Sequence, residues 1–197
     1  MKKIKLITTI ALLSLVFSAC SMTTEMTDDT HLSIDKNGAV NSHIKESFGE
    51  AYYNIDELKE SINKSLEEYK AIGLSDGDVK LSDAALSDGD VVIDMTYASG
   101  RDFENFDGYT FFAGKVADAV AQNYSLHTVL IDVDDSTTTI SEADIKAMEN
   151  SNILITDYED LIYLPSKIIY ASDNCTIKDN SVKANDGSTG LIYVIYK

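Results

Sequence analysis

The sequence is poor in proline, tryptophan and basic residues, and each shortage argues against a kind of segment, binding site or partner. Its 197 residues contain one proline, which excludes a proline-rich linker, and no tryptophan, which argues against an aromatic sugar-binding platform. The 16 Lys and Arg residues are outnumbered by 33 Asp and Glu residues, so the formal net charge is −17 at pH 7. A surface this acidic repels phosphate groups, and we therefore exclude nucleic acid as a partner.

The first 20 residues have the layout of an export signal. Residues 1–5 contain three lysines, and residues 6–17 follow without a charge and are mostly apolar. This apolar length suits a signal peptide. It is too short for a transmembrane helix, which needs about 20 apolar residues. Two small residues, Ser18 and Ala19, then precede Cys20.

Residues 16–20, with the sequence Val-Phe-Ser-Ala-Cys, resemble a lipobox, the cleavage and lipidation signal of bacterial lipoproteins. Phe17 stands where leucine is usual. The resemblance implies that the signal peptide, residues 1–19, is removed and that Cys20 receives a diacylglyceryl group with palmitate-type chains. An ordinary secretory signal with an incidental cysteine is the alternative. Each buried CH₂ contributes about 0.8 kcal/mol, so two acyl chains would hold the protein firmly at the extracytoplasmic face of the cell membrane.

Removal of residues 1–19 leaves 178 residues, which suits one domain or two small ones. The signal holds three basic residues and no acidic one, so the mature chain has a formal net charge of −20. Residues 20–29 show no periodicity, and we predict that they form a flexible tether. With Cys20 lipidated, only Cys175 remains, which excludes an intramolecular disulfide and a cysteine-ligated metal cluster. We expect Cys175 to be a structural thiol.

Local patterns predict most of the secondary structure. Residues 31–35 and 39–48 read as two strands joined by a turn at Asn37 and Gly38. The clearest helix covers residues 55–72, because its apolar residues recur at helical spacing. Asn54 is expected to cap this helix and Gly73 to end it.

The rest of the chain alternates short helices with strands. We expect a hairpin at 79–86 and 91–98, a turn of helix at 99–107, a strand at 109–113, helices at 116–122 and 141–150, and strands at 127–133, 152–156, 161–164, 167–171, 175–178 and 191–196. The last strand is apolar on both faces, so it should lie inside a sheet. Together these elements predict an α+β fold with a largely antiparallel sheet packed against one main amphipathic helix. Residues 30–150 form the α+β domain, and residues 151–197 are a strand-rich part of it or a small domain of their own.

Catalytic and metal-binding patterns are missing from the sequence. No Gly-x-Ser-x-Gly elbow, His-Glu-x-x-His pair or phosphate loop is present, and the Asp-rich loops lack the spacing of a calcium loop. His31 and His43 flank the first turn and could face each other, but two ligands on a surface hairpin make a poor metal site. His127 precedes a predicted buried strand and is expected to be structural. We therefore expect no catalytic residue, no metal, no cofactor and no enzyme activity.

The chain also resembles uncharacterised lipoproteins of clostridia-type Gram-positive bacteria. This resemblance depends on the lipobox and on four short segments in the same order: Lys-Asn-Gly at 36–38, Asp-Glu-Leu-Lys at 56–59, Met-Thr-Tyr at 95–97 and Ile-Tyr-Ala-Ser at 169–172. It implies no activity and transfers no site residue.

The leading hypothesis is a membrane-anchored lipoprotein without catalytic activity that binds an envelope protein or a small ligand. An accessory lipoprotein of a transport or cell-wall maintenance system and a cryptic hydrolase are the alternatives. A pocket with convergent polar groups would favour ligand binding, and a flat apolar patch would favour a protein partner. A histidine paired with a carboxylate in a cleft would favour the enzyme.

Overall fold

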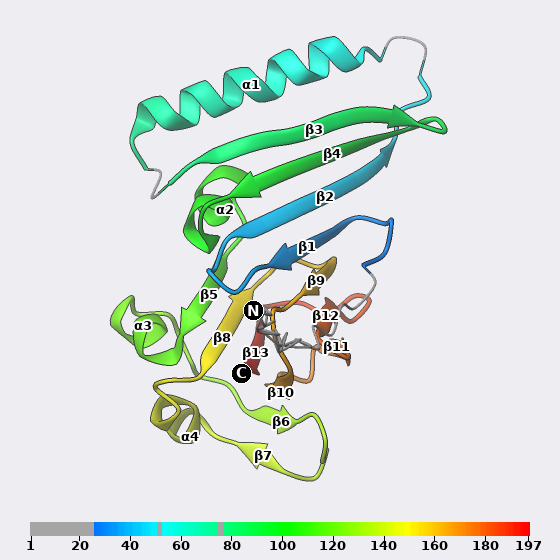
Figure 1. Ribbon diagram of the computed structural model, residues 1–197. Coiled ribbons are helices and arrows are strands. Elements are labelled where there is room, and N and C mark those ends of the chain that lie inside the picture. The colour runs from blue at the N-terminus through cyan, green and yellow to red at the C-terminus, as the bar shows by residue number, and fades with distance from the viewer. Residues whose placement is uncertain (1–25, 51–52, 75–76) are drawn as a thin grey trace, which may run out of the picture.

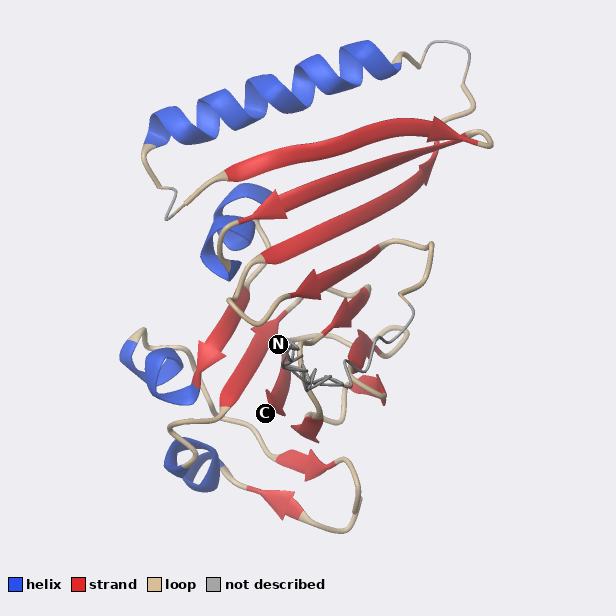
Figure 2. Cartoon of the chain, viewed as in Figure 1, coloured by secondary structure: helices blue, strands red, loops and turns tan. Residues whose placement is uncertain are grey.

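The computed structural model describes residues 26–50, 53–74 and 77–197. Within them the chain forms thirteen strands in two sheets, with four helices at the periphery (Figures 1 and 2). This arrangement confirms the predicted α+β class. The signal peptide of residues 1–19, Cys20 and the first part of the predicted tether lie outside the described residues.

The first sheet has seven strands and contains the predicted hairpins. Its order is β11 (Cys175–Lys178), β12 (Ser181–Ala184), β9 (Leu161–Tyr163), β1 (His31–Ile34), β2 (Val40–Ser47), β4 (Asp90–Tyr97) and β3 (Val79–Ser87). All neighbouring strands are antiparallel except β1 and β9, which are parallel. The turn at Gly38 has a φ of 87°, a left-handed conformation that glycine adopts without strain.

The second sheet has six strands, and each pair of neighbours is antiparallel. Its order is β5 (Phe111–Lys115), β8 (Asn152–Thr156), β13 (Ile192–Tyr196), β10 (Ile168–Ala171), β6 (Leu130–Asp132) and β7 (Thr139–Ile140). Residues from 152 onward therefore supply strands to both sheets. Residues 30–150 and 151–197 are thus built into the same two sheets.

The main helix, α1 (Ile55–Ile72), forms for the reasons that the sequence indicates. The Asn54 side chain accepts hydrogen bonds from the backbone N–H groups of Asp56 and Glu57, and Gly73 ends the helix with a φ of 72°. The helix runs along β3 (Figure 1), but only Leu66 and Tyr69 are buried, so it covers part of the sheet rather than a whole face. The shorter helices are α2 (Gly100–Asp107), α3 (Val116–Ala121) and α4 (Glu142–Ala147).

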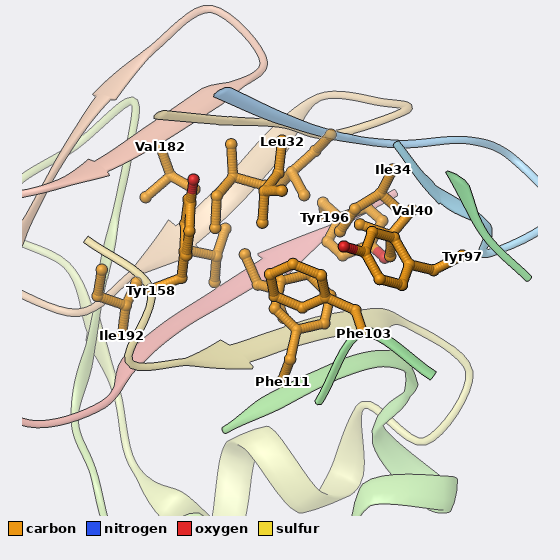
Figure 3. Close-up of a cluster of buried hydrophobic side chains, with 14 of the residues drawn as sticks. Leu32, Ile34, Val40, Tyr97, Phe103, Phe111, Tyr158, Val182, Ile192 and Tyr196 are labelled. Carbon is orange, nitrogen blue, oxygen red and sulfur yellow. The ribbon is translucent and has the colours of Figure 1, made fainter. Parts of the chain in front are cut away.

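Two apolar clusters hold these layers together. The larger one lies between the two sheets, where Tyr97 and Phe111 of different sheets both contact Phe103 of α2 edge to face, with ring centroids 5.1 and 4.9 Å apart (Figure 3). The smaller one joins the other face of the second sheet to α3 and α4. Strand β13 contributes Val194 to the first cluster and Ile195 to the second. The final strand is therefore inside a sheet, as predicted from its apolar character.

Some local predictions were wrong. The strand predicted at 127–133 is reduced to β6, because Val129 is 58% exposed and only the middle of the segment joins the sheet. Strand β12 was missed, because its sequence Ser-Val-Lys-Ala is too short and polar to show a pattern. The single predicted sheet is two sheets, since strand partners far apart in sequence leave no local signal.

Candidate functional site

The outer face of the seven-stranded sheet carries polar side chains over β1, β2 and β4, because side chains alternate along these strands. On β1 and β2, Leu32 and Val40 point into the core, while their neighbours Ser33 and Asn41 lie on the opposite face. Strand β4 repeats the pattern, with Met95 buried and Thr96 on the outer face. This alternation gathers the polar side chains of β1, β2 and β4 on one surface.

Two histidines stack at the centre of this face. His31 and His43 are register partners across the β1–β2 hairpin, and their ring centroids lie 5.0 Å apart at an interplanar angle of 27°. The prediction that these residues could face each other is therefore confirmed. The ring of Tyr163, from β9, meets His31 edge to face at 5.3 Å, and His31 is only 7% exposed.

Each imidazole donates one hydrogen bond from Nδ1. His43 Nδ1 lies 2.8 Å from Oδ1 of Asp94 on β4, and His31 Nδ1 lies 2.8 Å from the backbone oxygen of Asp29. Carbonyl and carboxylate oxygens accept, so Nδ1 carries the proton in both rings. Nε2 of His43 is buried and has no hydrogen-bond partner in the described chain. A buried acceptor without a partner costs about 1–3 kcal/mol, so this nitrogen lowers the stability of the fold.

The chain that enters β1 packs beside these histidines. The backbone N–H of Thr27 donates to the hydroxyl of Tyr163 at 3.0 Å, and the Lys45 ammonium lies 2.7 Å from the Asp28 carboxylate. This hydrogen bond and ion pair hold the pKa of Asp28 below its ordinary value and raise that of Lys45. The predicted tether of residues 20–29 therefore differs from the structure over residues 26–29, which contact the domain.

A hollow of about 400 Å³ opens beside the histidine pair, and we call it the histidine hollow. It is lined by Met26, Thr27, His31, Ser33, Asn41, Ser42, His43, Ser82, Asp94, Met95 and Thr96. A hydrogen-bond chain crosses it, because the hydroxyls of Ser82 and Thr96 are 2.9 Å apart and Thr96 donates to Oδ1 of Asn41 at 3.2 Å. The hollow therefore brings hydroxyl, amide, carboxylate and imidazole groups together.

A second, larger hollow of about 610 Å³ lies between the β1–β2 turn, the start of α2 and strand β5. The acidic residue of its lining, Glu104, is engaged by other residues of the protein. Its carboxylate accepts hydrogen bonds from the Tyr124 hydroxyl at 3.1 Å and from the backbone N–H of Phe111 at 3.4 Å. Burial and the nearby Glu104 raise the pKa of Tyr124 to about 12. These bonds stabilise the junction of the sheets, so this hollow is the weaker candidate.

The other residues considered from the sequence lie apart from the histidine hollow. Cys175 donates from Sγ to the backbone oxygen of Ser172 at 3.3 Å, and burial raises its pKa to about 11, as expected of a structural thiol. His127 was expected to be structural because it precedes a predicted buried strand. Its side chain is instead 82% exposed and pairs with Glu142 on the surface. In the acidic loop, Asp132 accepts backbone N–H groups of its own turn.

Residues 26–50, 53–74 and 77–197 contain no group of three His, Cys, Asp or Glu side chains placed to hold a metal ion. No helix among them has both the length and the apolar character that a membrane span requires. Asp94 and Tyr163 complete the site, and sequence reasoning missed both. The polar positions of the second hairpin could have indicated Asp94, whereas the pairing of β9 with β1 has no local signal.

Comparison of the chain with known protein families, with curated proteins and with solved structures found no match. The chemistry of the site must therefore be judged from its own geometry.

Proposed function

We propose that this protein is a lipoprotein anchored at the extracytoplasmic face of the membrane, whose domain binds a small polar ligand in the histidine hollow. The lipobox-like residues that end at Cys20 support the anchor. The observation that carries the binding role is the hollow of about 400 Å³, in which hydroxyl, amide, carboxylate and imidazole side chains converge. A flat apolar patch would favour a protein partner, whereas this site is a hollow with a few converging hydrogen-bonding groups, which is the form of a small-ligand site.

A hydrolase is the second candidate, because the bond from His43 to Asp94 resembles the pair of a general base and its orienting carboxylate. A general base would use Nε2 to remove a proton, and this atom is buried. Ligand binding without catalysis therefore fits the geometry better. Turnover of ester substrates by the wild type and by Asp94→Asn tests this. A hydrolase would lose turnover by several orders of magnitude in the variant, whereas a binding protein would show no turnover in either form.

Membrane fractionation tests the anchor, with the two cysteines as a matched pair. Cys20→Ser should move the protein from the membrane to the soluble fraction, because the lipid acceptor is lost. Cys175→Ser removes the other cysteine and should leave the protein in the membrane. Globomycin, which blocks the lipoprotein signal peptidase, should cause the unprocessed form to accumulate in the wild type. Membrane retention and globomycin-sensitive processing that both persist in Cys20→Ser would contradict the proposed anchor.

A further inference from the structure

The position of Met26 in the sequence limits how far the histidine hollow can lie from Cys20. Met26 lines the hollow. Met26 is six positions after Cys20 in the sequence, and an extended chain spans at most about 3.3–3.6 Å per residue. If Cys20 carries the lipid, as proposed above, the mouth of the hollow lies within about 20 Å of the membrane surface.

The lining of the hollow is unsuited to an anionic ligand. None of its eleven residues is lysine or arginine, and its one carboxylate belongs to Asp94. The lysines of β2 and β3 have partners of their own, since Lys45 pairs with Asp28 at 2.7 Å and Lys80 pairs with Asp78 at 3.0 Å. Among the described residues that line the hollow, a phosphate group would therefore meet a carboxylate and no lysine or arginine to neutralise it.

The hydrogen-bonding groups of the hollow match hydroxyl groups. Each ligand hydroxyl can donate to a carboxylate and accept from an amide at the same time. Asp94 supplies acceptor oxygens, the Asn41 amide nitrogen supplies donors, and Ser33 can act either way. The Ser82 and Thr96 hydroxyls use their protons in the hydrogen-bond chain to Asn41, so they can accept from a ligand. Met26, which is 56% exposed at the rim, adds an apolar contact for the part of a ligand that adjoins acyl chains.

We infer that the histidine hollow binds the uncharged, polyhydroxylated head group of a membrane lipid, such as a glycosyl diacylglycerol. Recognition uses hydrogen bonds without an indole platform, in keeping with the absence of tryptophan. Each contact is weak, but anchoring beside the bilayer raises the effective concentration of the head group, so modest affinity suffices. The inference depends on the proposed anchor for the source of the ligand, and its test is separate from the fractionation test.

Calorimetry on the mature protein, purified from membranes in a neutral detergent, tests the inference. The probes are glycosyl diacylglycerol, free glycosylglycerol and phosphatidylglycerol. We expect saturable binding of the glycolipid, weaker binding of free glycosylglycerol and none of phosphatidylglycerol. Asn41→Ala and Thr96→Ala should each weaken glycolipid binding by about fivefold or more, because each removes hydrogen bonds to hydroxyls. Asn63→Ala, an exposed site on α1, is the matched control and should bind as the wild type does.

Each contrary result has a definite meaning. Equal affinity for free glycosylglycerol and glycolipid would overturn the membrane source, and preference for phosphatidylglycerol would overturn the uncharged class. Unchanged binding by both Asn41→Ala and Thr96→Ala, with wild-type circular dichroism, would place the ligand elsewhere. No binding of either glycosylated probe would overturn the inference and leave the membrane anchor to be decided by the cysteine variants.

Discussion

Leu32→Ala should destabilise both parts of the chain together. Leu32 is fully buried on β1, where its register partners are Ser42 of β2 and Ile162 of β9. Its side chain thus lies at the junction between the N-terminal hairpin and the C-terminal strands, in the cluster between the sheets (Figure 3). Truncation leaves a cavity that close-packed neighbours fill only partly.

The loss can be estimated from the burial of this side chain. Leucine-to-alanine changes at fully buried sites cost about 2–5 kcal/mol, and we expect about 3 kcal/mol here. For a domain of this size, that loss lowers the melting temperature by about 6–12 °C. Urea unfolding followed by circular dichroism measures the free energy, and hydrogen exchange shows which strands lose protection.

The control lies on the same strand. Ser33→Ala changes the next residue, which faces the outer surface, and it should alter the free energy of unfolding by less than about 0.5 kcal/mol. Peptides from β1 and β9 should lose protection together in Leu32→Ala. A loss below about 1 kcal/mol, or protection in β9 that stays at the wild-type level, would refute a core shared by both sheets.

Three further substitutions or reactions test other features. His43→Phe removes the buried Nε2, so it should leave stability unchanged or raise it by up to about 2 kcal/mol in urea unfolding. It should also weaken glycolipid binding, because the phenyl ring no longer donates to the Asp94 carboxylate and holds it in place. A large loss of stability would give His43 a structural role. Cys175 should react with iodoacetamide at pH 8 roughly 200-fold more slowly in the folded protein than in urea. Burial raises its pKa to about 11, which leaves far less thiolate than the ordinary pKa of about 8.5 does in the unfolded chain. Equal reaction rates would contradict the burial of this thiol. Gly77→Ala should lower the free energy of unfolding by about 1–3 kcal/mol, because an added Cβ would lie 2.4 Å from Cβ of Ala98. Gly49→Ala is the control and should not lower it, because the space around Gly49 is open. Equal effects of the two changes in thermal unfolding would disprove the close approach.

The elements that the sequence predicts well are those with a local physical cause. Asn54 and Gly73 bound α1 because a capping side chain and a left-handed residue act on their own backbone. The Asn37-Gly38 turn fixes the register of its hairpin, and this register alone places His31 opposite His43. Half of the candidate site was therefore predictable before the fold was known.

The remaining features depend on contacts between distant segments. The parallel pairing of β1 with β9 brings Tyr163 to His31, although more than a hundred residues separate them. Asp94 reaches His43 through the pairing of two hairpins. No periodicity within either segment predicts these contacts, because they depend on which strands pair and which faces of the sheets are buried together. The contacts of residues 26–29 escaped prediction for the same reason, since Lys45 and Tyr163 hold them from other strands.

Mass spectrometry of the N-terminal peptide of the mature protein, extracted from membranes, tests the proposed anchor most directly. We predict a peptide that begins at Cys20 and carries the added mass of a diacylglyceryl group on its thiol. An N-terminus at another residue, or a Cys20 thiol that iodoacetamide alkylates, would contradict it.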